Sequence, residues 1–160
     1  QEKTETPLLL KVLGFSAYTE GWGLYAEQLA DEIGMYENDP WGRIGSIQSL
    51  MFRAARLVVD SGLHYKRWSR EQGIRYMVET LGDQESSITT EVERYAVWPG
   101  QASSYKVGHT TWVRLREQAK ATLGDRFDIK GFHDTGLDAG GVPLTVLERV
   151  IGDWVASRRG

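Results

Sequence analysis

The sequence contains no cysteine, and three of its 160 residues are histidine. The absence of cysteine excludes disulfides and metal sites built on thiolates, although it does not identify the cellular compartment. His64, His109 and His133 lie far apart and show no paired ligand spacing. The chain therefore does not carry a complete histidine-based metal site by itself. A single histidine is more often a surface or helix-capping group than a ligand.

The sequence also lacks long hydrophobic runs and any strong excess of one charge. No apolar run approaches the roughly 18 residues that a membrane-spanning helix needs. The formal net charge is -3, and lysine and arginine are scattered apart from the pair Arg158 and Arg159. We therefore expect no membrane-spanning segment and no nucleic-acid partner.

The size and composition fit one globular unit. A chain of 160 residues with 41% hydrophobic residues can bury a substantial core. Its amino terminus is polar, has no initiating methionine and does not resemble a signal peptide. We expect residues 1–160 to form a single helical domain that is a fragment of a larger protein, with cytoplasmic and exported locations both open.

Nearly every segment has the apolar spacing of a helix. Asp39 and Pro40 are typical of a helix start, and Ser69 with Gln72 forms a capping box. The first of these helices should end near Gly62, and its apolar pattern comprises Ile44, Ile47, Met51, Ala54, Ala55, Val58 and Val59. Further helices are expected over residues 87–97, 101–123, 128–137 and 143–154. Residues 8–13 are the one candidate strand. The sequence thus predicts an all-α fold, an irregular multi-helix bundle.

Glu20 is the most informative candidate residue. It lies between Tyr18 and Trp22, with Gly21 and Gly23 on either side of the tryptophan. Glycine weakens a helix by about 1 kcal/mol relative to alanine and often permits close approach of a backbone or a ligand. A carboxylate in such a crowded, partly dry place needs a cation, an arginine or a metal as its partner. The alternative is a surface glutamate beside an aromatic core stripe.

A second candidate group lies in the following helix. Arg56 and Asp60 are four residues apart and can pair along one helix face. Together with Arg53 they form either a solvated salt-bridge face or a buried site, in which arginine orients Glu20 or holds a substrate carboxylate. His64 follows at the helix end, where the macrodipole favours a cation.

A third group begins at Gln101. Gln101 and Tyr105 are four residues apart on the first turns of a helix, so they project from one face, which Gly108 and Trp112 continue. A phenol near a helix start can donate to a developing oxyanion, and the helix terminus adds a favourable field. The alternative is a tyrosine–tryptophan core stripe with a polar cap.

These segments resemble the carboxy-terminal part of a bacterial family, domain-of-unknown-function family 885. The resemblance rests on four blocks in the same order, AYTEGWGLYAE at 17–27, RAARLVVDSGLH at 53–64, WSREQ at 68–72 and RYAVWPGQASSYKVG at 94–108. The region 127–154 also fits. The family in turn resembles helical zinc peptidases of the thimet oligopeptidase and angiotensin-converting enzyme kind.

The resemblance implies roles for individual residues. Family members carry a histidine–glutamate motif upstream of the Thr-Glu-Gly-Trp block, and a glutamate on the next helix of helical zincins is the third zinc ligand. By position, that ligand is Glu20. The resemblance also implies that Tyr105 stabilises the oxyanion, that Arg94 and Gln101 line the substrate site, and that Arg56, Asp60 and His64 support it. The full candidate set is Tyr105 and His64 as catalytic residues, Arg53, Arg56, Arg94 and Gln101 for substrate, Glu20 for metal, and Asp60, Tyr25 and Glu27 as supporting residues.

The histidine–glutamate motif is absent from this chain, and with it two metal ligands and the general base. Catalytic zinc sites use three protein ligands and a water. We therefore expect a parent protein that is a zinc-dependent, peptidase-like hydrolase acting on a peptide or small amide. This chain should be inactive alone and should need the upstream half of the same protein as its partner.

Two other hypotheses stay open. The chain could be a non-catalytic helical module that binds a peptide or small ligand. It could also use Glu20 and Glu27 as paired acids, since seven residues of helix place them about 10 Å apart on one face.

Overall fold

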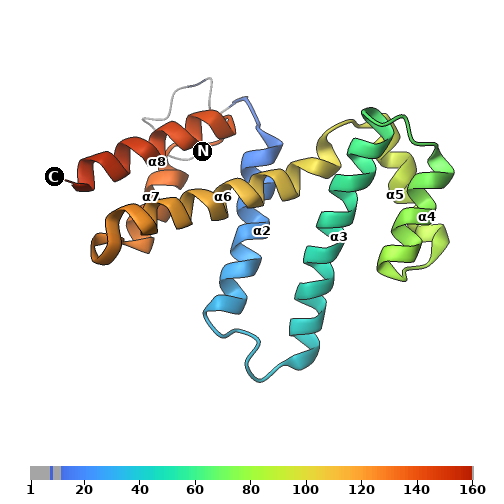
Figure 1. Cartoon of the computed structure of the whole chain (residues 1–160), viewed down its shortest axis with the longest axis horizontal. Helices are drawn as coiled ribbons and strands as arrows, with labels where there is room; N and C mark the ends of the chain where they lie inside the picture. The colour runs from blue at the N-terminus through green and yellow to red at the C-terminus, as the bar shows by residue number, and fades with distance from the viewer. Residues whose placement is uncertain (1–7, 9–11, 160) are drawn as a thin grey trace.

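The computed structural model describes residue 8 and residues 12–159. This part of the chain is helical and contains no strand, which confirms the all-α, multi-helix prediction (Figure 1). The helices are α2 (Ser16–Glu32), α3 (Pro40–His64), α4 (Arg70–Leu81), α5 (Glu85–Val97), α6 (Gln101–Leu123), the short 3₁₀ helix η1 (Gly124–Arg126), α7 (Ile129–Asp138) and α8 (Leu144–Arg159). Of the candidate strand, residues 9–11 lie outside the described residues, while Leu8 and Val12 are helical. None of the described helices has the length and hydropathy to cross a membrane.

Helix starts follow the capping signals in the sequence. The Asp39 side chain accepts a hydrogen bond from the Gly42 amide at 2.9 Å, and Pro40 opens α3. Ser69 and Gln72 form the capping box of α4, and the Asp128 carboxylate caps α7. These caps satisfy amide groups that have no partner within the helix.

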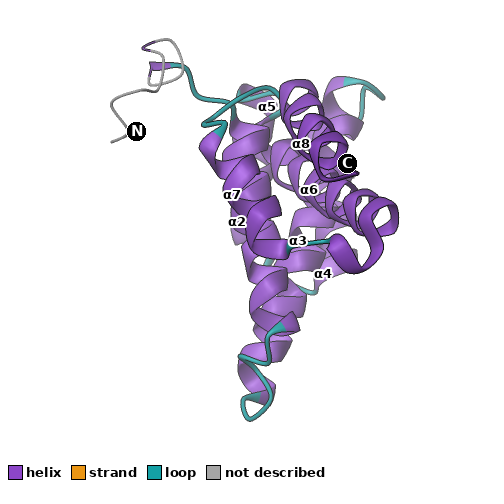
Figure 2. Cartoon of the chain, turned by 90° about the vertical axis from the view of Figure 1, so that its left-hand side faces the viewer, coloured by secondary structure: helices purple, strands orange, loops and turns teal. Residues whose placement is uncertain are grey.

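Two hydrophobic cores lie along α6. One core joins α6 to α2, α7 and α8 around the fully buried side chains Tyr25, Trp112, Phe132 and Leu147. The other joins the start of α6 to α3, α4 and α5 around Val59, Met77 and Val92. α6 therefore runs from one core to the other, as Figure 1 shows. The loop between α2 and α3 projects away from both cores (Figure 2).

The buried face of α3 differs from the expected one. Of the predicted apolar pattern, Ala55 and Val59 are buried, whereas Ile44, Ile47, Met51, Ala54 and Val58 are exposed. The face that packs against α4, α5 and α6 instead contains the charged residues Arg56 and Asp60, each 2% exposed. The sequence pattern combined two apolar faces of α3, and only one of them belongs to the core of the described part.

Candidate active site

An arginine–tyrosine cluster occupies the junction of α3, α5 and α6. It consists of Arg53 and Arg56 on α3, Arg94 on α5, and Gln101 and Tyr105 on α6. The guanidinium carbons of Arg53 and Arg56 lie 4.5 and 4.7 Å from the centroid of the Tyr105 ring. Cations at this distance are attracted to the ring face. Five of the candidate residues, from two sequence blocks and three helices, thus lie together.

Gln101 connects two arginines of this cluster. Its side-chain oxygen accepts hydrogen bonds from Arg56 Nη2 at 3.0 Å and from Arg94 Nη1 at 3.2 Å. Because both bonds use the oxygen, the NH₂ group of the same amide is left to donate elsewhere. Gln101 therefore both fixes the arginines and offers a donor.

The arginines differ in how their charge is balanced. Arg94 pairs with Glu91 at 2.7 Å, and the Tyr95 hydroxyl donates to the same carboxylate at 2.8 Å. Burial alone would raise the pKa of Glu91, but the hydrogen bonds from Arg94 and Tyr95 and the charge of Arg56 lower it below its ordinary value. Glu91 is therefore a fully engaged anion.

Arg53 and Arg56 have no such partner. Among the described residues neither arginine forms an ion pair, and the Nε atom of each is buried without a hydrogen-bond acceptor. The burial of Arg56 contradicts the solvated salt-bridge interpretation and agrees with the buried alternative. A buried guanidinium with unused donors is costly unless a further acceptor is supplied.

Asp60 and His64 hold the surrounding helices in place. Asp60 accepts hydrogen bonds from the amides of Gly100 at 3.2 Å and Ser103 at 2.9 Å, so it caps the start of α6 and does not pair with Arg56. His64 Nε2 lies 2.9 Å from the carbonyl oxygen of Tyr95, to which it can donate, and 3.5 Å from Asp60. Both side chains therefore bind backbone groups of α5 and α6, the helices that carry Arg94, Gln101 and Tyr105.

Glu20 lies on α2 beside the point where α2 crosses α6. The crossing is close because a Cβ on Gly108 would overlap the carbonyl oxygen of Ala17, and a Cβ on Gly21 would overlap the Gly108 backbone. Tyr105 precedes Gly108 by three residues, so it lies on the same side of α6. Glu20 and Tyr105 therefore flank one helix crossing.

The Glu20 carboxylate is half-buried and forms no hydrogen bond or ion pair with the described residues. Glu27, two turns further along α2, accepts a hydrogen bond from Ser49 of α3 at 3.0 Å. No group of three metal-ligating side chains exists within the described residues. At this site the described part of the chain thus offers a metal one carboxylate, that of Glu20.

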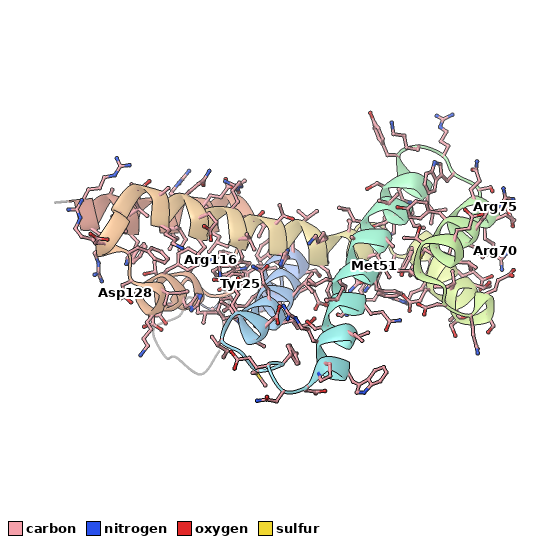
Figure 3. All side chains as sticks on the ribbon, turned by 60° about the horizontal axis from the view of Figure 1, so that its bottom comes forward. Tyr25, Met51, Arg70, Arg75, Arg116 and Asp128 are labelled. Carbon is pink, nitrogen blue, oxygen red and sulfur yellow. The ribbon has the colours of Figure 1, made fainter. Side chains whose placement is uncertain are left out.

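The sequence did not predict a second polar network, which lies in the core formed by α2, α6, α7 and α8. Tyr25 is fully buried, and its hydroxyl lies 2.9 Å from His133 Nε2 and 3.4 Å from Arg116 Nη1. Arg116 also binds both carboxylate oxygens of Glu32, at 2.8 and 3.0 Å. Figure 3 shows Tyr25 and Arg116 side by side between α2 and α6. Tyr25, predicted to be a supporting residue of the site, connects α2 through these contacts to α6 and α7.

A sequence signal for this network existed. Gln28 and Glu32 are four residues apart on α2, and His109 and Arg116 are seven apart on α6, so each pair lies on one helix face. Gln28 donates to Glu32 at 2.7 Å and accepts from His109 at 2.7 Å. The pairing of the two faces could not be read from either helix alone.

Comparison with known proteins gives a family and two close structural neighbours. A model of the family DUF885, described as bacterial protein of unknown function, matches residues 1–151. No curated protein sequence matches. A crystal structure from Colwellia psychrerythraea is 55% identical with a TM-score of 0.92 over 96% of this chain. A solved structure from Shewanella oneidensis is 26% identical with a TM-score of 0.84 over 92% of this chain. Both are described as a putative lipoprotein, and the chain spans 26% and 27% of their lengths, respectively.

Proposed function

Because the chain belongs to the bacterial family DUF885, we propose that it is the carboxy-terminal part of a zinc-dependent, peptidase-like hydrolase. The observation that carries this proposal is the placement of Glu20 and Tyr105 at one crossing of α2 and α6, next to a cluster of arginines. A metal ligand, an oxyanion donor and a substrate-binding group are three parts that a metallopeptidase site needs. The chain spans about a quarter of its solved relatives, so the remaining parts would come from other segments of a longer protein.

Glu20 would hold the zinc. Its half-buried carboxylate has no partner among the described residues, and this fits one of the three protein ligands of a catalytic zinc site. The other two ligands and the general base would come from the upstream half. When bound, zinc would supply a Lewis acid that polarises the substrate carbonyl and acidifies a water. This chain alone would therefore be inactive.

Tyr105 would act on the substrate carbonyl. Its hydroxyl makes no hydrogen bond to the described residues, so the O–H is free to donate to the carbonyl oxygen as negative charge develops there. Arg53 and Arg56 over its ring would make the phenol a better donor through their positive field. The free NH₂ of Gln101 would add a neutral donor for the substrate backbone.

The exposed face of α3 would contact the upstream half. Ile44, Ile47, Met51 and Val58 are 54%, 58%, 39% and 37% exposed, and their spacing places them along one side of the helix. A contiguous apolar stripe of this kind is typical of a surface covered by another protein segment. The part of the longer parent that lies outside this chain would cover the stripe.

The longer parent would be exported. The neighbour that is 55% identical is described as a lipoprotein, and lipoproteins are anchored to membranes through a covalent lipid. Labelling of cells that express the longer chain with radioactive palmitate tests this part of the proposal, and absence of label in the protein would contradict it.

The metal ligand is tested with Glu20→Gln in the longer parent chain. Loss of groups that only surround a metal ligand weakens metal binding by about 10- to 100-fold. We expect loss of the ligand itself to lower zinc affinity at least that much, measured by competition with a chelator. Glu79→Gln, an exposed position on α4, is the matched control and should leave zinc affinity unchanged.

Two results would contradict this function. Zinc affinity that is the same in Glu20→Gln and the wild type would remove Glu20 from the site. A parent that carries the histidine–glutamate motif and still binds no metal would favour the second function, a helical module that binds a peptide without cleaving it.

A further inference from the structure

We propose that Arg53 and Arg56 form a binding site for a carboxylate group of the substrate, the free carboxyl terminus of a short peptide. The inference deepens the proposed function and rests on it for the peptide nature of the ligand. The binding of a carboxylate itself follows from the charges and donors of the cluster and does not require zinc.

The first argument is unpaired charge. Glu91 accepts from Arg94 and Tyr95, while Asp60 accepts from the amides that start α6. Arg53 and Arg56 form no ion pair with the described residues, so both charges can be offered to a bound carboxylate.

The second argument is the number of unused donors. The guanidinium carbons of Arg53 and Arg56 lie 4.5 and 4.7 Å from the Tyr105 ring centroid. Arg53 makes no hydrogen bond to the described residues, so its outer N–H groups are available to a ligand. The planar fork of an arginine matches the two oxygens of a carboxylate. The two arginines beside the Tyr105 ring therefore form a preorganised carboxylate site.

The third argument is access. Arg53 and Phe52 line an open surface depression of about 270 Å³ at the edge of the cluster. Because it is small and open, it suits the end of a longer ligand that extends into solvent. Asp83 lies on the same depression, so the depression presents charges of both signs.

The test compares two probes that differ in one charge. N-acetyl-alanyl-alanine carries a free carboxylate, and its carboxy-terminal amide does not. Binding of both to the longer parent chain is measured by calorimetry, with and without a chelator that removes zinc. We expect the acid to bind about tenfold more tightly than the amide under both conditions, because a charge-assisted hydrogen bond contributes about that factor.

Variants locate the site. Arg53→Gln should abolish the preference for the acid, and Arg53→Lys should keep only part of it, because lysine retains the charge without the fork. Arg70→Gln removes an exposed arginine that pairs with Glu93, and it should leave the preference unchanged. Arg53 is half-buried whereas Arg56 is buried, so the Arg53 variants disturb the core less.

Several outcomes would overturn the inference. Equal binding of acid and amide, no binding of either, or an acid preference that survives in Arg53→Gln would each do so. Displacement of the acid by an equal concentration of inorganic phosphate would show a general anion site instead. A preference that persists without zinc would stand even if the Glu20→Gln test failed, so the two proposals fail separately.

Discussion

At the scale of single residues, His109 illustrates how burial sets a charge state. It is 7% exposed, its Nε2 lies 2.7 Å from Gln28 Oε1, and Lys106 Nζ lies 3.2 Å from its Nδ1. Burial, followed by the charges of Lys106 and Arg116, lowers the pKa of His109 to about 4. The imidazole is therefore neutral at pH 7, donating to Gln28 and accepting from Lys106.

This state makes stability depend on pH. The unfolded chain protonates His109 near its ordinary pKa of about 6.5, so between pH 6.5 and 4 the unfolded state binds more protons. The contribution of neutral His109 to the free energy of unfolding is fully present above about pH 6.5 and is lost as the pH falls toward 4. We expect the wild type to lose on the order of 2 kcal/mol more than His109→Gln between pH 7 and pH 5. Urea unfolding at both values measures this difference.

The glutamine variant keeps a donor for Gln28 but does not titrate. The carboxylates common to both proteins contribute equally to the pH dependence of the unfolding free energy, so the difference reports on His109. An identical pH dependence in the two proteins would contradict a neutral, buried His109.

Residue patterns predicted part of the candidate site. The four-residue spacing of Gln101 and Tyr105 predicted that they share one face of α6, and both side chains contact Arg56. The pairing of Arg56 with Asp60 was wrong, because the Asp60 carboxylate accepts hydrogen bonds from the backbone amides at the start of α6 instead. A spacing along one helix does not reveal which other helix competes for the same carboxylate.

At the scale of helices, the crossing of α2 and α6 fixes the site. Gly21 and Gly108 bring the two backbones together, and neither position has room for a Cβ. A Cβ on Gly23, two residues further along α2, would meet nothing within 4 Å. The sequence predicted a close approach at both α2 glycines, and the structure confirms it at Gly21.

The two glycines of α2 should respond oppositely to alanine. Gly21→Ala would force α2 away from α6 and should lower the free energy of unfolding by about 1–3 kcal/mol. Gly23→Ala adds a methyl group in open space and should raise it by up to about 1 kcal/mol, through higher helix propensity. Chemical denaturation of both variants measures the changes, and a stabilising Gly21→Ala would contradict the close crossing.

Helix boundaries were the most predictable feature. The caps at Asp39, Ser69 and Asp128 depend on side chains a few residues away, so they can be recognised in the sequence. The face of α3 that packs inward could not be recognised, because Ile44 and Ile47 are as apolar as Ala55 and Val59. Which apolar face is buried depends on partners that lie elsewhere in the chain.

At the scale of the whole molecule, α6 runs between the two cores (Figure 1). The exposed stripe of α3 belongs to neither core. If the rest of a longer parent covers this stripe, a charge placed there would be buried without a partner. We expect Ile47→Lys to lower the unfolding free energy of the longer chain by about 2 kcal/mol or more. Thr90→Lys, at an exposed position on α5, should change it by less than about 0.5 kcal/mol. Equal effects of the two variants would mean that the stripe stays in solvent.

The most direct measurement is a crystal structure of the longer parent grown with zinc, with the metal located by its anomalous scattering. We expect an anomalous peak about 2.0–2.2 Å from a carboxylate oxygen of Glu20, on the Tyr105 side of the crossing between α2 and α6. A zinc ion bound elsewhere, with Glu20 directed into solvent, would contradict the proposed role of this chain.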